Sequence, residues 1–149
     1  VAGITYSTNF PIASAFQASS GGNSDGFVSK INAAGSALLY STYLGGSRQD
    51  QVNGIALDSL DDVHLTGITS SSNFPIVSAF QPLYGGGVCL TFDCADAFVV
   101  KLNPAGSALV YSTYLGGNDD DQGLTIAVDA AGNAYVAGLT TSNDFPPVG

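Results

Sequence analysis

Apolar and polar residues alternate in short runs along this chain, and Gly, Asn, Asp and Pro separate the runs. Runs that are rich in β-branched and aromatic residues are typical of short β-strands. No window keeps a period of 3.6 residues, so the pattern predicts no helix. The predicted strands lie at residues 1–5, 27–31, 38–44, 54–58, 63–69, 98–102, 109–115, 125–129 and 134–140.

Long stretches of the pattern occur twice. "DGFVSKINAAGSALLYSTYLGG" at 25–46 recurs as "DAFVVKLNPAGSALVYSTYLGG" at 96–117, and "GITYSTNFPIASAFQ" from Gly3 recurs as "GITSSSNFPIVSAFQ" from Gly67. A third copy of the second phrase begins at Gly138 as "GLTTSNDFP". Each unit supplies four strands joined by turn residues, which is the pattern of a β-propeller blade.

The predicted fold is therefore all-β, with propeller-type blades of four antiparallel strands. Residues 1–24 are the end of one blade and a linker, residues 25–95 are a blade with a cysteine-containing loop inserted at its end, and residues 96–149 are a second blade. About two blades and an extra N-terminal strand are too few to close a ring. Three interpretations stay open: a piece of a longer array, a subunit that completes its sheets with other copies, or a compact two-sheet variant.

The extra strand supplies a mechanism for the second interpretation. An unpaired strand can complete the sheet of a neighbouring molecule by strand addition. The residues expected to do so are Val1, Ala2, Gly3, Ile4 and Thr5.

The phrases "YSTYLGG", "GIALD" and "IAVDAAGNAYVAGLTTSNDFP" resemble the SBBP family of β-propeller repeats, and "IAVDAAGNAYVAG" is also similar to NHL-type repeats. The resemblance implies a bacterial secreted or surface protein, hence an extracellular or cell-surface location. It implies a fold but no particular reaction. The sequence departs from the repeat pattern at "DSLDDVHLTG", which lacks the Gly-Asn turn, and at the cysteine loop.

The net charge of the chain limits the kinds of molecule that it is expected to bind. The net charge is −9, and only Lys30, Arg48 and Lys101 are basic, so binding to nucleic acid or to an anionic membrane surface is not expected. No apolar run is long enough for membrane insertion. The expected partners are further copies of the chain or the rest of a longer propeller chain.

Cys89 and Cys94 are the two cysteines and stand close together in a Gly-rich segment. They are predicted to form a local disulfide in an oxidising compartment, and an inert reduced pair is the alternative. A zinc site is not expected, because His64 is the sole histidine.

The aspartates fall into two groups. Asp25, Asp50 and Asp58 recur as Asp96, Asp121 and Asp129, so each pair is expected to bond backbone amides at equivalent turns. Asp119, Asp120 and Asp121 instead form an acidic run whose oxygens suit calcium, with a solvated acidic turn as the alternative. No other cofactor is predicted.

No arrangement of residues predicts catalysis. His64 aligns with Tyr135 of the next copy, which favours a structural or surface role. The repeated tyrosines Tyr40, Tyr43, Tyr111 and Tyr114 are expected to pack between blades. The sequence predicts a noncatalytic extracellular structural or interaction module that self-assembles or adheres. The alternative is a piece of a larger secreted propeller protein that presents loops to a ligand or substrate, as part of an enzyme.

Overall fold

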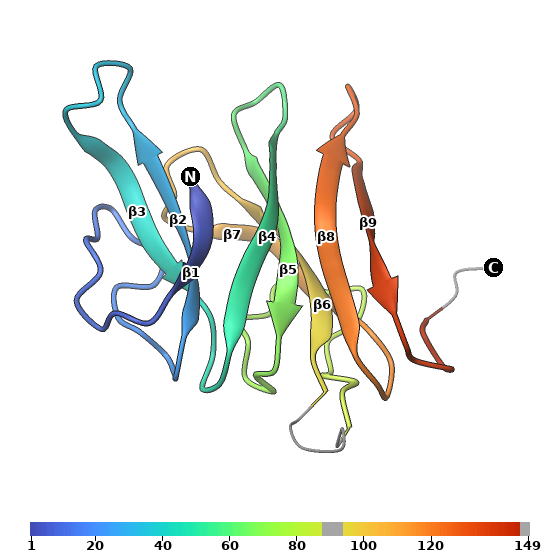
Figure 1. The fold of residues 1–149 in the computed structure, drawn as a ribbon. Helices are drawn as coiled ribbons and strands as arrows, with labels where there is room; N and C mark the ends of the chain where they lie inside the picture. Colours follow the sequence, from blue (N-terminus) through green and yellow to red (C-terminus); the bar gives the residue numbers. More distant parts are fainter. Residues whose placement is uncertain (88–93, 147–149) are drawn as a thin grey trace.

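The computed structural model describes residues 1–87 and 94–146, and every regular element in these ranges is a β-strand. The strands in Figure 1 are β1 (Ala2–Thr5), β2 (Asp25–Ile31), β3 (Leu38–Leu44), β4 (Asp50–Leu57), β5 (Val63–Thr69), β6 (Asp96–Leu102), β7 (Leu109–Leu115), β8 (Asp121–Val128) and β9 (Ala134–Thr140). The all-β prediction is confirmed. Among the described residues, no helix has the length and apolar character needed to cross a membrane.

Four strands begin earlier than the sequence pattern predicts, β2 and β6 by two residues and β4 and β8 by four. Strand β4 starts at Asp50 instead of Gly54, and β8 starts at Asp121 instead of Thr125. Each contains a register shift near its glycine, between Val52 and Gly54 in β4. A bulge of this kind breaks the alternation of side chains. The first part of each strand was therefore missed.

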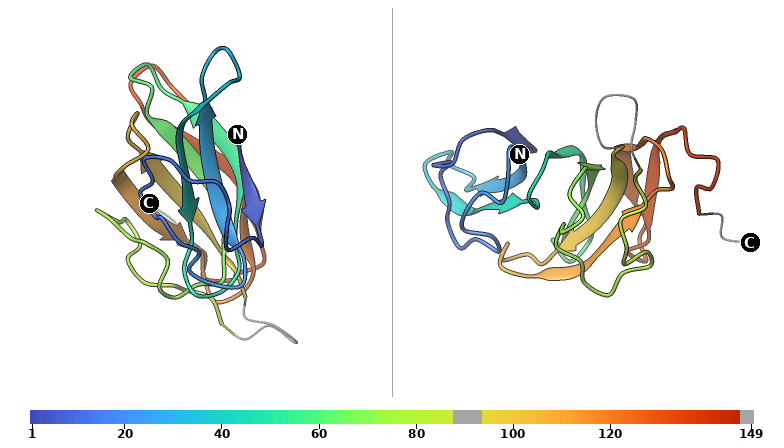
Figure 2. Two further views of the ribbon diagram at one scale, coloured as in Figure 1. Left: turned by 90° about the vertical axis from the view of Figure 1, so that its left-hand side faces the viewer. Right: turned by 90° about the horizontal axis from the view of Figure 1, so that it is seen from below.

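The strands form three antiparallel sheets, in the orders β1-β2-β3, β4-β5-β6-β7 and β8-β9. The sheets stand side by side in Figure 1, and the view from below in Figure 2 shows that they form an arc and not a ring. The middle sheet has the four strands of a propeller blade. The two end sheets contain three and two strands, so the propeller is incomplete, as predicted.

The sheets cross the predicted domain boundaries. The segment predicted as one blade, residues 25–95, contributes β2 and β3 to the first sheet and β4 and β5 to the middle sheet. Strand β5 pairs with β4 on one side and with β6 on the other, so the middle sheet continues across the predicted boundary at 95/96. The boundaries at 24/25 and 95/96 therefore mark the sequence repeat, while the break between sheets falls after β3 and after β7.

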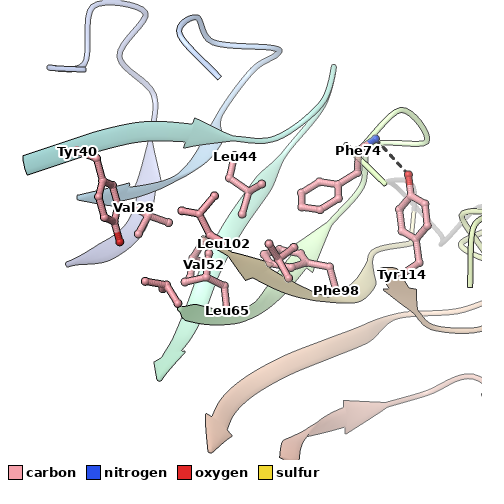
Figure 3. Close-up of a cluster of buried hydrophobic side chains, with 11 residues drawn as sticks. Val28, Tyr40, Leu44, Val52, Leu65, Phe74, Phe98, Leu102 and Tyr114 are labelled. Carbon is pink, nitrogen blue, oxygen red and sulfur yellow. Dashed lines mark hydrogen bonds between the residues drawn. The ribbon is translucent and has the colours of Figure 1, made fainter. Parts of the chain in front are cut away.

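The core lies mainly between the first and middle sheets (Figure 3). Val28 and Leu44 of the first sheet contact the middle sheet, where Leu65 and Phe98 are fully buried. Phe74, from the linker after β5, stacks on Phe98 with ring centroids 4.7 Å apart. Burying one such side chain contributes about 1.5–3 kcal/mol.

The linkers protect the outer edges of β3 and β7. Residues Ala13 and Gln17 form bridges to Ser41 and Tyr43 of β3, and the second copy of the linker forms the equivalent bridges to β7. An edge strand that is already paired in this way does not present free backbone groups to other chains. The opposite end of the first sheet, at β1, has no such cover among the described residues.

The third sheet is far more exposed than the middle one. His64 of β5 is 0% exposed, whereas Tyr135, its counterpart in β9, is 61% exposed, and Leu139 of β9 is 63% exposed. Strand β5 pairs on both sides and is covered by neighbouring sheets, while β9 is the last strand of a two-stranded sheet. Equivalent residues therefore have different environments because the third sheet lacks its outer strands.

Candidate functional site: a buried aspartate anchor in each repeat

Each repeat joins three segments around one buried carboxylate, an arrangement that we call the aspartate anchor. It consists of the Gly-Gly pair after β3 or β7, the aspartate that opens β4 or β8, and a Thr-x-Ser-x-Asn/Asp segment that begins with the last residue of β5 or β9. The middle anchor contains Gly45, Gly46, Asp50, Thr69, Ser71 and Asn73. The C-terminal anchor contains Gly116, Gly117, Asp121, Thr140, Ser142 and Asp144.

Asp50 is fully buried and receives hydrogen bonds on both oxygens. The Gly46 amide donates to Oδ2 at 2.7 Å, and the Ser71 hydroxyl donates to the same oxygen at 2.9 Å. The Thr69 hydroxyl donates to Oδ1. Burial raises the pKa of Asp50, and these donors oppose the rise. The carboxylate thus ties the start of β4 to the end of β5 and to the turn after β3.

The C-terminal anchor repeats this geometry. The Gly117 amide donates to Asp121 Oδ2 at 2.7 Å, and the Ser142 hydroxyl donates to it at 2.8 Å. Asp144 accepts the Asn118 amide at 2.9 Å. Unlike Asp50 Oδ1, the buried Oδ1 of Asp121 has no hydrogen-bond partner. The second copy of the anchor is therefore less completely bonded than the first.

A second buried carboxylate lies beside each anchor. A Cβ placed on Gly45 would lie 2.1 Å from Asp25 Oδ1 and 2.7 Å from Asp50 Oδ2, so both carboxylates approach this glycine. Gly116 has the same position between Asp96 and Asp121. Burial, followed by the charge of Asp121, raises the pKa of Asp96 to about 6. The "YLGG" phrase recurs because only glycine leaves room for the two carboxylates.

The predicted pairing of aspartates with backbone amides is confirmed. Asp25 accepts the Gly21 amide and Asp96 accepts the Gly85 amide, at 3.0 and 2.7 Å. At the hairpins, Asp58 and Asp129 each accept two backbone amides from the turns that follow them. Each pair therefore performs one structural task in two equivalent places.

The aspartates of the predicted calcium turn are engaged separately. Asp121 belongs to the anchor, Asp120 accepts the Ala95 amide at 2.9 Å, and Asp119 accepts the Asp120 amide at 2.9 Å. Within residues 1–87 and 94–146, no group of three or more His, Cys, Asp or Glu side chains is arranged to hold a metal ion. Calcium binding at this turn stays a prediction that the geometry does not favour.

Of the predicted disulfide pair, Cys89 lies outside the described residues. Cys94 is buried, with its sulfur 3.9 Å from Asp119 Oδ1, and its amide donates to the Gly87 carbonyl. The Cys89–Cys94 disulfide therefore stays a prediction.

Sequence reasoning missed the polar cluster around His64. The imidazole is fully buried, with Nε2 3.1 Å from Asp58 Oδ2 and Nδ1 3.1 Å from the Tyr111 hydroxyl. Lys101 donates to the same Asp58 oxygen at 2.8 Å, and the ion pair with Lys101, followed by the bond to His64, lowers the pKa of Asp58. In the next copy, Tyr135 donates its hydroxyl to Asp129 at 3.1 Å. The sequence signal for this cluster was that His64 and Tyr135 occupy equivalent positions, each six residues after an equivalent aspartate. Because His64 is buried, we assign the imidazole a structural role.

The repeated tyrosines hold the linkers and the sheet interface. Tyr43 donates to the Ser7 carbonyl and Tyr114 to the Ser71 carbonyl, both at 2.8 Å. Tyr40 is buried against Gly106, which lies in the turn between β6 and β7. Packing between blades is thus confirmed for Tyr40, while Tyr43 and Tyr114 bond the linkers beside their own sheets.

The predicted exchange strand, from Val1 to Thr5, is paired within its own chain. Ala2 to Thr5 form β1 and lie opposite Val28 to Asp25 of β2, and the Val1 ammonium group donates to the Ser29 carbonyl at 2.9 Å. Strand β1 is nevertheless the edge of its sheet. The side of β1 that faces away from β2 therefore remains available for pairing with another strand.

Taken together, the anchors join strands that are distant in sequence and place no nucleophile beside an accessible base. The hydrogen bonds of the anchors fasten one repeat unit to the next.

Comparison with known proteins identifies the same repeat unit. The SBBP beta-propeller repeat matches residues 39–75 and 110–146, and each match runs from the second strand of a unit through its anchor. No curated protein matches the chain. The chain belongs to the SBBP beta-propeller repeat family.

Proposed function

We propose that this chain is a noncatalytic structural module of an extracellular or cell-surface assembly, and that it self-assembles through its incomplete end sheets. The observation that carries the proposal is the contrast between β5 and β9, which have nearly the same pattern of residues. All but one residue of β5 are buried, whereas most of β9 is exposed, including Tyr135 and Leu139. Exposed apolar surface of this kind marks an interaction site.

The opposite end of the arc supports the same function. Ile31 and Leu39 of the first sheet are exposed, and β1 is an edge strand. Because the two ends differ in their missing strands, association of one end with the other is heterologous, and such contacts produce rings or filaments.

The extracellular location is supported by composition. The two cysteines suit an oxidising compartment, and bacterial surface proteins are the setting that the repeat family implies. A structural role is supported by the buried position of His64, since a catalytic base needs access to a substrate.

Light scattering across a range of chain concentrations, combined with electron microscopy, tests self-assembly. The expected result is a mass that rises with concentration and particles that are rings or filaments. Ile31→Asp should abolish the rise, because it places a charge on the exposed flank of the first sheet. The matched control is Leu60→Asp, which changes a 72% exposed leucine in a hairpin turn. A folded chain that stays monomeric at all concentrations would overturn the proposal.

A further inference from the structure

The first sheet carries half of an aspartate anchor. Thr5, Ser7 and Asn9 are the first copy of the Thr-x-Ser-x-Asn segment, and the Ser7 amide donates to the Thr5 hydroxyl at 3.1 Å. The equivalent bonds, from Ser71 to Thr69 and from Ser142 to Thr140, exist in both complete anchors. There, the segment also binds an aspartate and the amides that follow a Gly-Gly pair. Among the described residues, no such strand lies beside β1.

A glycine supplies an independent indication of what is missing. A Cβ on Gly67 would overlap the Gln51 carbonyl oxygen of β4, and one on Gly138 would overlap the Gln122 carbonyl oxygen of β8. Gly3 occupies the same position in β1, where a Cβ would meet only the side chain of Phe27. A glycine is therefore present in β1 although no backbone carbonyl of the described chain approaches it.

We propose that the open edge of β1 is a docking site for strand β8 of a second copy of this chain. In the docked pair, the partner's Gln122 carbonyl would approach Gly3, and the partner's Asp121 would accept the hydroxyl of Ser7. Asn9 would accept the partner's Asn118 amide, as Asp144 does within one chain. This inference rests on the proposed self-assembly and names the strand that performs it.

The composition of the sheets explains why β8 is the occupant. The turn before β8 contains the required Gly-Gly pair, and β8 begins with the required aspartate. The present partner of β8, strand β9, is mostly exposed. In the docked pair, β1 of one copy would replace β9 beside β8 of the second copy. Strand β8 would then extend the sheet β1-β2-β3 to four strands, the number in the middle sheet. A two-stranded sheet is marginally stable, so this exchange favours the docked state.

A peptide with the sequence of residues 116–128 tests the site on the full chain. Titration followed by NMR should shift the amides of β1, and a peptide carrying Asp121→Ala should bind at least tenfold more weakly. In the chain, Ser7→Ala should weaken binding of the native peptide to a similar extent, and Gly3→Val should abolish it. Thr8→Ala is the matched control, because Thr8 is exposed and lies outside the anchor positions.

The outcomes separate this inference from the proposed function. Equal binding of the native and Asp121→Ala peptides, or unchanged β1 amides, would overturn the docking site. If the chain assembles and the Gly3→Val and Ser7→Ala variants assemble equally well, assembly uses another surface and the inference is again overturned. If the chain stays monomeric while the peptide binds with the expected specificity, the docking site is supported and self-assembly fails.

Discussion

The hydroxyl of Ser71 donates to Oδ2 of Asp50 at 2.9 Å, across a separation of 21 residues in the chain. This bond fastens the end of β5 to the start of β4, next to the turn that leaves β3. It lies where the first sheet meets the middle sheet, since the amide of Asp50 also donates to the Ser24 carbonyl before β2. Stability of the sheet interface should therefore depend on this one carboxylate.

Asp50→Ala should lower the free energy of unfolding by about 2–4 kcal/mol, because three donors would lose a buried acceptor. Urea unfolding measures the change. Asp121→Ala is the matched variant in the C-terminal anchor, where one carboxylate oxygen has no hydrogen-bond partner. It should lower the free energy of unfolding by less than Asp50→Ala does. A larger loss for Asp121→Ala than for Asp50→Ala would contradict the ranking.

Gly45→Ala should be destabilising by about 2 kcal/mol or more, because the new methyl group would collide with the carboxylates of Asp25 and Asp50. Thermal unfolding measures the effect. Gly35→Asn is the control: Gly35 has a φ of 69° with no atom within 4 Å of its Cβ position, and asparagine tolerates this conformation. If both substitutions cost the same, crowding around Gly45 is not the reason for the glycine.

Tyr114→Phe should destabilise the linker after β5 by about 1–3 kcal/mol. The hydroxyl accepts the Phe74 amide at 3.1 Å, as Figure 3 shows, and donates to the Ser71 carbonyl. Hydrogen exchange of the Phe74 amide should become faster. Tyr6→Phe, at a 73% exposed tyrosine, should leave that amide unchanged. Unaltered protection of Phe74 in the Tyr114→Phe protein would show that the hydroxyl is dispensable.

The raised pKa of Asp96 predicts how stability varies with pH. In the unfolded chain this carboxyl titrates near 4, and in the folded chain at about 6. The folded state therefore retains the proton more strongly, and this contribution is complete below pH 4. It is lost as the pH rises to about 6, by roughly 1–3 kcal/mol.

Unfolding measurements at intervals between pH 4 and 7 test this slope. The Asp96→Asn variant should show a flatter profile than the wild type, since its amide does not titrate. The lowered pKa values of Asp58 and Asp129 act in the opposite direction but only below about pH 4, so they do not obscure the comparison. Parallel profiles for the two proteins would refute the assignment to Asp96.

The strands and the turn aspartates could be predicted from the sequence because the forces that form them are local. Alternation along "FVVKL" and the turn residues of "NPAG" specify a strand and its end within a few positions. The sequence repeat also showed that Asp25 and Asp96 occupy equivalent positions. Equivalent residues in equivalent surroundings form equivalent hydrogen bonds, so both were expected to bind backbone amides. The anchors themselves join segments more than twenty residues apart, and only the folded chain shows which hydroxyl meets which carboxylate.

By itself, the sequence determined the number of repeat units and the central residues of each strand, because both follow from local pattern and from identity between copies. The tertiary structure decided where one sheet ends and the next begins. Strand β5 has pairing groups on both edges, and only long-range contact selects β4 and β6 as its partners. The tertiary structure also decided that His64 is buried while Tyr135 is exposed, because burial depends on the neighbouring sheet and not on the residue's place in the repeat.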